Sequence, residues 1–298
     1  MDRRVIALGF FDGVHLGHGG LLRRAKQWAD ELGCAASAMT FDRHPSVVIS
    51  GKPTPLITSR RDREYLMKNL YHMDEVLFVH FSHAMMEMPW EEFLDECLLR
   101  DLNVSHVICG ADFHFGYRGR GTAELLRAAC RERGIGCDVI DEISVDGVPV
   151  HSSLVRQLLL GGEMEKAARF LGHPHCLGGQ VITGKRLGRT IGIPTANIPV
   201  PRDVLTLPFG VYATKVAFEG EEHLAVTNVG DCPTVSEGAP VMVEPWILDF
   251  SGDLYGREIR VFFYKKLRDE IRFPSLSALQ AEIRKNAEET RSYFADRT

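Results

Sequence analysis

A chain of 298 residues, 45% of them hydrophobic, is long enough for two domains that each have a core. The formal charge of -5 at pH 7 excludes broad electrostatic binding to nucleic acid or to a membrane surface, so local groups have to capture anionic ligands. Seven cysteines without a C-x-x-C pair indicate neither a disulfide framework nor a zinc site, and no apolar run approaches the roughly 20 residues of a membrane span. We therefore expect a cytoplasmic protein without a targeting segment and without an obligate protein partner.

The first motif lies at residues 9–18, between an apolar run at 5–8 and a segment whose apolar residues recur at helical spacing. This pattern predicts a strand, a turn and a helix. Glycines in the turn let backbone N–H groups approach a ligand, and His15 and His18 stand at the helix N-terminus, which favours anions. The motif indicates a site for the phosphates of a nucleotide, and the alternative is a tight turn with incidental histidines.

Strands and helices then alternate as far as residue 172. Apolar spacing predicts strands over 35–41, 75–81, 104–109 and 136–143, and helices over 58–71, 89–102, 122–133, 152–160 and 163–171. Such alternation predicts a parallel, doubly wound sheet with a ligand crevice at the carboxyl ends of its strands. The alternation of strand and helix patterns ends at His173 and Pro174, which predicts two domains, 1–172 and 173–298.

The second domain shows strand patterns over 179–182, 210–218, 223–229, 241–250 and 258–267, with a hairpin turn at residues 219–221. Only its end, from Leu276 to Phe294, has helical spacing, and Ser277 with Gln280 suggests a capping box. We expect a small, closed antiparallel barrel with a C-terminal helix across it, because closure removes exposed strand edges.

A second phosphate-handling motif lies at residues 184–197, which contain three glycines and three basic residues before a Pro-Thr-x-Asn step. Thr195 and Asn197 are two residues apart on an extended segment, so their side chains point the same way. Their oxygens are hard ligands that suit Mg²⁺. The pattern predicts a loop that covers phosphates, and the alternative is an ordinary basic hairpin loop.

Several stretches together resemble one family. The His15-Leu16-Gly17-His18 core, with residues 40–45, 110–116 and 151–156, resembles the adenylyltransferase half of the prokaryotic bifunctional riboflavin kinase/FMN adenylyltransferase (FAD synthetase) family. Residues 184–197, 210–213, 228–234, 243–244, 253–256 and 267–273 resemble its riboflavin kinase half. The resemblance spans residues 4–295 and implies a Rossmann-like nucleotidyltransferase domain followed by a riboflavin kinase-like barrel.

For adenylyl transfer the resemblance implies catalytic roles for His15, His18 and Arg156. The implied ATP-binding set is Gly9, Phe10, Asp12, Gly13, His15, Gly17, His18, Ser152, Ser153 and Arg156. The implied flavin-binding set is Phe41, His44, Pro45, Asp112 and Phe113. On the residues alone, Ser152 could instead be only a helix cap, Arg156 part of a solvated face, and the aromatic residues part of the core.

For riboflavin phosphorylation the resemblance implies Glu244 as the general base, with Mg²⁺ held by Thr195 and Asn197. The implied ATP-binding set is Gly184, Lys185, Gly188, Arg189, Gly192, Pro194, Thr195 and Asn197, and Arg268 and Phe273 are implied flavin contacts. As a bare residue Glu244 could equally be a solvated strand carboxylate. The chain departs from the family pattern at Pro245-Trp246 after Glu244, at His151 before the serine pair, and at Asn286, where aspartate is usual. We expect Pro245 to lie at a strand edge or bulge, and the change at Asn286 to be peripheral.

These features predict an enzyme that phosphorylates riboflavin to FMN and then adenylylates FMN to FAD, with riboflavin, FMN and ATP as its small-molecule substrates. Three alternatives stay open. A chain of this architecture could retain only the adenylyltransferase activity, or it could bind flavin without catalysis. A fragment of an aminoacyl-tRNA synthetase is suggested by the H-x-G-H core alone, and no large basic surface supports it.

Overall fold

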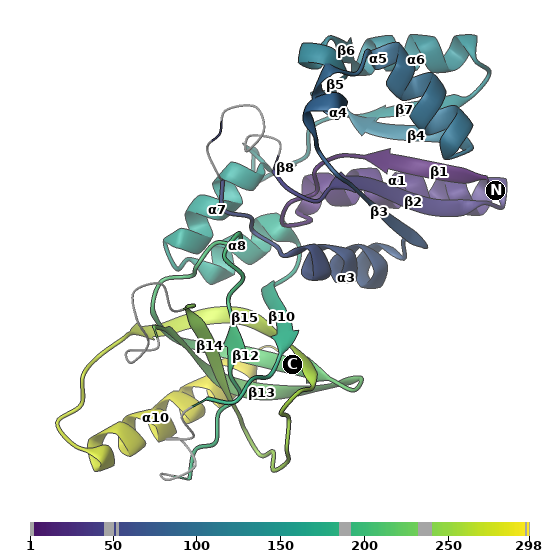
Figure 1. The fold of residues 1–298 in the computed structure, drawn as a ribbon. Helices are drawn as coiled ribbons and strands as arrows, with labels where there is room; N and C mark the ends of the chain where they lie inside the picture. Colours follow the sequence, from purple (N-terminus) through teal and green to yellow (C-terminus); the bar gives the residue numbers. More distant parts are fainter. Residues whose placement is uncertain are drawn as a thin grey trace. The chain divides into compact units, whose positions relative to one another are not determined.

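The computed structural model describes residues 3–44, 51, 54–184, 192–231, 240–295 and 297 (Figure 1). Its contacts divide the chain into two compact units. The first comprises residues 1–56 and 63–152, and the second comprises residues 57–62 and 153–298. None of the helices in the described ranges is long and apolar enough to cross a membrane.

The first unit is built on a parallel sheet with the strand order β3-β2-β1-β4-β7. Its strands are β1 (Arg4–Leu8), β2 (Ala35–Phe41), β3 (Glu75–Val79), β4 (Val104–Gly110) and β7 (Gly136–Ile140). The chain leaves β1 toward β2 on one side, and β4 joins on the other. The crevice of such a sheet lies where the strand order reverses, so it is expected beyond the carboxyl ends of β1 and β4.

The helices of this unit cover both faces of the sheet, which confirms the doubly wound architecture. They are α1 (Leu16–Leu32), α3 (Arg60–Tyr71), α4 (His83–Glu87), α5 (Trp90–Glu92), η1 (Phe93–Asp101), the short 3₁₀ turn η2 (Tyr117–Gly119) and α6 (Ala123–Glu132). Ile6 and Leu8 share a core cluster with Leu98 of η1 and Leu126 of α6. Helix α1 packs against β1, β2 and β4.

Several local details of the first unit differ from the sequence prediction. Residues 93–101 form a π-helix instead of a continuous α-helix, and its end carries the i to i-5 hydrogen bond from Leu102 N to Cys97 O, 3.1 Å long. Strand β7 ends at Ile140, three residues earlier than predicted. Two short antiparallel strand pairs were not predicted from the sequence. They are β5 (His114–Phe115) with β6 (Gly121–Thr122) and β8 (Ser144–Val145) with β9 (Val148–Pro149).

The second unit contains a six-stranded antiparallel sheet in the order β10-β15-β12-β13-β14-β11. Its strands are β10 (His175–Gln180), β11 (Ile198–Pro199), β12 (Gly210–Phe218), β13 (Glu221–Gly230), β14 (Met242–Ile247) and β15 (Glu258–Asp269). The two outer strands approach each other, since Ile182 N just after β10 donates to Asn197 O just before β11 at 2.9 Å. The sheet is therefore a nearly closed barrel, as predicted.

The predicted hairpin between β12 and β13 is confirmed. Glu219 and Gly220 both have left-handed backbones, with φ of 52° and 86°, as a type I′ turn requires. Helix α10 (Leu276–Ala295) ends the chain's regular structure. Its cap is Ser275, whose Oγ accepts from Ala278 N at 3.2 Å, so the capping box expected at Ser277 is wrong.

Helices α7 (Ser152–Leu160) and α8 (Met164–Leu171) pack with the barrel. Leu159 and Leu171 share one buried cluster with Tyr212 and Phe263 of the barrel strands. The compact units therefore divide after Ser152, twenty residues before the predicted limit at residue 172. This packing assigns α7 and α8 to the second compact unit, and the functional domain limit at residue 172 stays a prediction.

Candidate functional site

The first unit contains a cavity of about 1080 Å³ beyond the carboxyl ends of β1, β4 and β7. The loops that follow these three strands supply much of its wall, as the strand order leads one to expect. Six of the predicted ATP-binding residues line it: Gly9, Phe10, His15, Gly17, His18 and Ser152.

His15 caps helix α1. Its Nδ1 accepts the backbone N–H of His18 at 3.3 Å, and the two imidazole rings are stacked with centroids 3.6 Å apart. Because Nδ1 acts as acceptor, a neutral His15 carries its proton on Nε2, where it can donate to an anion. A Cβ at Gly17 would lie 3.1 Å from the His15 ring, so a larger residue there would crowd the cap.

His18 is held in its neutral form. Burial lowers its pKa well below the ordinary value, and electrostatic interactions with His15 and with the Arg63 guanidinium lower it further. At neutral pH His18 therefore contributes no fixed imidazolium charge to the resting site. A bound triphosphate adds negative charge beside His18 and thus favours proton uptake by this ring.

The turn that carries these histidines is held from several sides. Ser152 Oγ donates to the Asp12 carbonyl at 3.0 Å, which ties the start of α7 to the turn. The Asp12 side chain is buried, lies 4.0 Å from the Arg63 guanidinium and is not part of the cavity lining. Gly13 has a left-handed backbone with φ of 81° and is also outside that lining. Direct ATP contacts by Asp12 and Gly13 stay predictions.

The rest of the cavity wall is mostly apolar and rich in aromatic and methionine side chains. Phe41, Asp112 and Phe113 of the predicted flavin set belong to it. The Phe113 ring stacks on Phe115 at 5.3 Å. The segment around α4 contributes a part of the wall that no sequence motif predicted, although its methionine-rich composition is typical of adaptable apolar surfaces. Its lining residues are Phe81, Met85, Met86 and Met88.

Two residues of the predicted flavin-binding set, His44 and Pro45, are not among the described residues that line the cavity. The ring of His44 meets Phe10 edge-on at 4.8 Å and is not part of the cavity lining. Pro45 lies outside the described residues. Ser153 and Arg156 stand on α7 in the second compact unit, so their participation in the phosphate site also stays a prediction. His151, which precedes them, lines the cavity and pairs with Glu142 at 3.1 Å.

In the second unit, strand register brings several predicted residues into one row. Arg268 pairs with Val211, Val211 with Asn228, and Asn228 with Glu244. Directly opposed residues of neighbouring strands point to the same face of a sheet. Glu244 and Arg268 therefore share one face of the barrel, and α10 packs against β12 and β13 between them.

The row continues to the predicted metal ligand. Ile198 pairs with Val243, so the same register sets Asn197 opposite Glu244, and the hydrogen bond from Ala196 N to Pro245 O at 3.0 Å maintains it. A Cβ at Gly184 would lie 2.7 Å from the Asn197 side chain. The first residue of the predicted phosphate loop thus contacts the Asn197 amide, while Lys185, Gly188 and Arg189 lie outside the described residues.

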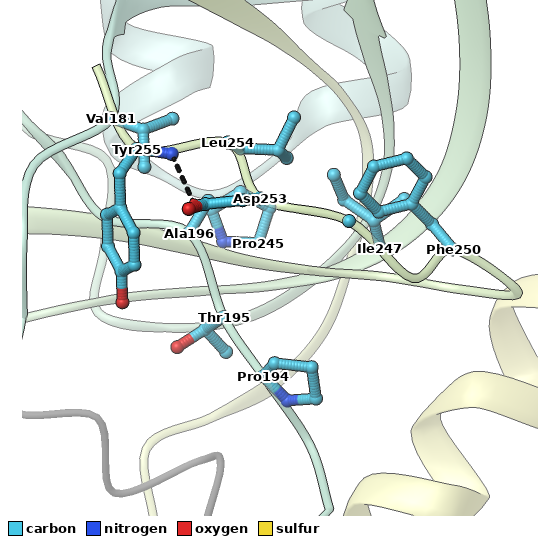
Figure 2. A pocket seen from close by; sticks show the side chains of 11 residues that line it. Val181, Pro194, Thr195, Ala196, Pro245, Ile247, Phe250, Asp253, Leu254 and Tyr255 are labelled. Carbon is cyan, nitrogen blue, oxygen red and sulfur yellow. Dashed lines mark hydrogen bonds between the residues drawn. The ribbon is translucent and has the colours of Figure 1, made fainter. Parts of the chain in front are cut away.

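Thr195 and Pro194 line a small pocket of about 60 Å³ (Figure 2). The segment 250–255 forms the other part of its wall, where the Asp253 carboxylate accepts the Tyr255 N–H at 3.1 Å. Gly192, two residues before Pro194, has a left-handed backbone with φ of 72°. The geometry brings Pro194 and Thr195 to the barrel rim beside Asn197.

Pro245 fits its strand without loss of a ladder hydrogen bond to β13. Its carbonyl accepts from Ala196 N, and in an antiparallel strand the N and O of one residue point to the same neighbour. The missing N–H therefore faces the side on which β11, only two residues long, has already ended. The expectation of an edge-like position for Pro245 is confirmed.

Arg268 is held by the final helix. Its Nε donates to Asn286 Oδ1 at 3.1 Å, and Glu282 lies 3.6 Å away. Phe273 stacks under the guanidinium at 5.5 Å. Asn286 is 1% exposed and belongs to the contact that holds Arg268, and the expectation that its change is peripheral to function stays a prediction. The sequence feature that could have indicated this position is the spacing of Asn286, which lies four residues after Glu282 on the same helix face.

No group of three or more His, Cys, Asp and Glu side chains in the described ranges could hold a metal ion. The oxygens of Thr195 and Asn197 form a different donor type. They stand on the face that carries Glu244, and the close approach of Gly184 to Asn197 leaves room only for backbone. This donor set would suit a hard divalent cation that accompanies the phosphates of a nucleotide.

Comparison with known proteins gives the same division of the chain. The sequence model of the family described as FAD synthetase matches residues 1–154, and that of riboflavin kinase matches residues 171–294. The bifunctional riboflavin kinase/FMN adenylyltransferase of Listeria monocytogenes is 36% identical over 98% of this chain and 93% of that protein. The proteins of the same description from Bacillus subtilis and Escherichia coli K12 are also 36% identical, over 99% and 97% of this chain and 93% and 92% of theirs.

A crystal structure from Streptococcus pneumoniae, described as a macrolide-efflux protein, superposes with a TM-score of 0.82 at 27% identity and covers 97% of this chain and 94% of that one. Its description differs from those of the sequence relatives, while its fold agrees with that of this chain. Two family models that together span most of the sequence, and relatives that match nearly from end to end, lead to one conclusion. The chain belongs to the bifunctional riboflavin kinase/FMN adenylyltransferase family.

Proposed function

We propose that this protein makes both flavin cofactors in sequence. The barrel unit transfers the γ-phosphate of ATP to the 5′-hydroxyl of riboflavin and yields FMN and ADP. The parallel-sheet unit then joins FMN to the AMP part of a second ATP and yields FAD and pyrophosphate. The observation that carries the proposal is the presence, in one chain, of two separate phosphate-handling arrangements, one around His15 and His18 and the other around Asn197 and Glu244.

For the kinase step, Glu244 accepts the proton that leaves the 5′-hydroxyl as the phosphoryl group is transferred. A carboxylate beside the acceptor hydroxyl suits this task, and its row neighbour Asn197 directs an amide oxygen to the same face. Arg268, fixed by Asn286 and Phe273, orients the flavin. Catalysis is then positioning and charge stabilisation, without a covalent enzyme intermediate.

Thr195 and Asn197 hold the divalent cation that accompanies ATP, which we propose to be Mg²⁺. When bound, such an ion neutralises charge on the β- and γ-phosphates. The chain's own contribution is to keep both oxygens on the face of Glu244 and to bring the backbone of Gly184 close to the Asn197 amide. Lys185, Gly188, Arg189, Gly192 and Pro194 complete the predicted ATP-binding loop.

For the adenylyl step, an FMN phosphate oxygen attacks the α-phosphate of ATP, and the bond to pyrophosphate breaks. His15 donates from Nε2, and His18 gains a proton as negative charge accumulates beside it. Ser153 and Arg156 add a hydroxyl and a guanidinium for the leaving pyrophosphate. The apolar remainder of the 1080 Å³ cavity takes the isoalloxazine ring.

The test is chromatography of the products that form from riboflavin and Mg²⁺-ATP. We expect FMN and then FAD from the wild type, no FMN from Asn197→Ala, and FMN without FAD from His18→Ala. Asn69→Ala and His72→Ala, at exposed positions, are matched controls that should behave as wild type. Equal loss of both products in each site variant would contradict the two-site assignment.

FAD formation from FMN, combined with no FMN formation from riboflavin, would favour the alternative that only the adenylyltransferase is retained. Flavin binding without ATP turnover would favour a carrier. The remaining proposals are a cytoplasmic location, functional domains at 1–172 and 173–298, and no nucleic-acid or obligate protein partner. They rest on the sequence features given above.

A further inference from the structure

Arg63 is a cation buried directly behind the phosphate-binding turn. It lies in the first turn of α3 and is 1% exposed. Its Nη1 is within hydrogen-bonding distance of the Phe10 carbonyl at 3.0 Å, the Thr40 hydroxyl at 3.1 Å and the Phe41 carbonyl at 3.1 Å. One guanidinium thus joins the chain just after β1 to the end of β2.

The charge of Arg63 is matched inside the protein. Asp12, also 1% exposed, lies 4.0 Å from Nη2, and the Phe10 ring covers the guanidinium at 4.6 Å. Burial of a pair of charges is costly, and it is tolerated where geometry and additional hydrogen bonds compensate. The contacts of Arg63 lie at the turn after β1 and at the end of β2, so the buried charge is placed directly beside the turn.

The turn needs such support because its backbone is strained. Phe11 and Val14, neither of which is glycine, adopt left-handed conformations with φ of 56° and 45°. For a β-branched residue such as valine this is a rare conformation, and it persists only where surrounding contacts determine it. The Phe10 carbonyl precedes the strained residues and accepts two hydrogen bonds, from Arg63 and from Thr40 Oγ1 at 2.6 Å.

We propose that Arg63 is a positioning residue for adenylyl transfer, which holds the turn from Phe10 to Val14 so that His15 and His18 meet the triphosphate of ATP in the reactive geometry. This inference rests on the proposed function. Arg63 does not line the cavity and acts through the backbone of the turn. Its positive charge also helps to keep His18 neutral before the nucleotide binds.

Arg63→Lys separates geometry from charge. Lysine retains a cation near Asp12 and has one nitrogen in place of the planar fork, so it cannot reproduce the set of contacts to Phe10, Thr40 and Phe41. We expect kcat for FAD formation from FMN to fall about tenfold in Arg63→Lys and about a hundredfold in Arg63→Gln, because small misplacement of catalytic groups has effects of this size. The KM for FMN should stay within about twofold of wild type.

Riboflavin phosphorylation by the same variants is the internal control, because Arg63 has no place in the kinase site. A merely structural role would lower both activities together, or lower only the yield of folded protein. Arg131→Gln, at an exposed arginine of α6, is the matched control and should leave both activities at the wild-type level. Thermal unfolding of each variant shows whether the measured protein is folded, and the lysine variant decides the question if the glutamine variant does not fold.

The proposal is overturned if Arg63→Lys forms FAD within twofold of the wild-type rate, or if its kinase activity falls in parallel. Thr40→Val adds a second measurement. It removes the other hydrogen bond to the Phe10 carbonyl, and its effect on FAD formation should be less than additive with that of Arg63→Lys, since both act on one carbonyl. Absence of FAD formation by the wild type would instead refute the proposed function itself.

Discussion

His175 should make the barrel unit sensitive to acid. It stands at the start of β10, is 4% exposed and lies 5.8 Å from the Phe263 ring. Its Nδ1 has no hydrogen-bond partner in the described part of the chain. Burial first, and then the nearby charge of His173, lower the pKa of His175 to about 3. The folded unit therefore keeps this imidazole neutral at every pH above about 3.

The sign of the effect follows from linkage. In the unfolded chain the imidazole takes up a proton as the pH falls below its ordinary pKa of about 6.5, and the folded unit does not bind that proton until about pH 3. The free energy of unfolding therefore decreases as the pH is lowered across this window. At pH 5, about 1.5 pH units below the ordinary pKa, the loss from this one group is about 2 kcal/mol.

The assay is urea unfolding of wild type and His175→Leu at pH 8 and pH 5. Trp246 reports on the second unit in a background where Trp28 and Trp90 of the first unit are replaced by phenylalanine. The change between the two pH values should be about 2 kcal/mol smaller in His175→Leu, because the comparison cancels every group that both proteins share. Equal pH dependence in the two proteins would refute the buried, neutral state of His175.

Three further predictions concern the second unit. Glu244→Gln should lower FMN formation at least a hundredfold, and FAD formation from supplied FMN should stay unchanged, as product chromatography can verify; loss of both would remove Glu244 from its role as base. Gly184→Ala adds a methyl group 2.7 Å from Asn197 and should weaken kinase activity with little change in thermal stability, and an unimpaired kinase would contradict the close approach. Arg260→Leu strips the fully buried Asp62 of an ion pair at 3.1 Å and should cost about 3–5 kcal/mol in thermal unfolding; a loss below about 1 kcal/mol would show that Asp62 becomes protonated or solvated at little cost.

The sequence predicted what depends on neighbours along the chain. The motif at residues 9–18 identified a strand, a turn and a helix whose first residues include His15 and His18. A glycine after a glutamate at 219 and 220 predicted the hairpin that the backbone angles confirm. These signals are local, because turn conformations and helix capping involve residues within three or four positions of one another.

The sequence did not predict the residues that reach the sites from a distance. Arg63 contacts the turn from more than fifty positions away, and nothing in its surroundings on α3 distinguishes it from the exposed Arg60 and Arg61. Asn286 looked peripheral because only the packing of α10 on the barrel brings it to Arg268. Burial of a polar side chain depends on what packs over it, which short-range patterns do not record.

The sequence by itself determined the two architectures, the two phosphate-handling motifs and the family. Tertiary structure alone decided that strand register aligns Asn197, Glu244 and Arg268 on one barrel face, and that the missing N–H of Pro245 costs no hydrogen bond to β13. A shift of one residue in any of these strands would reverse the faces of all its side chains. Periodicity along the chain predicts that a strand exists, and only its pairing with neighbours determines what its side chains meet.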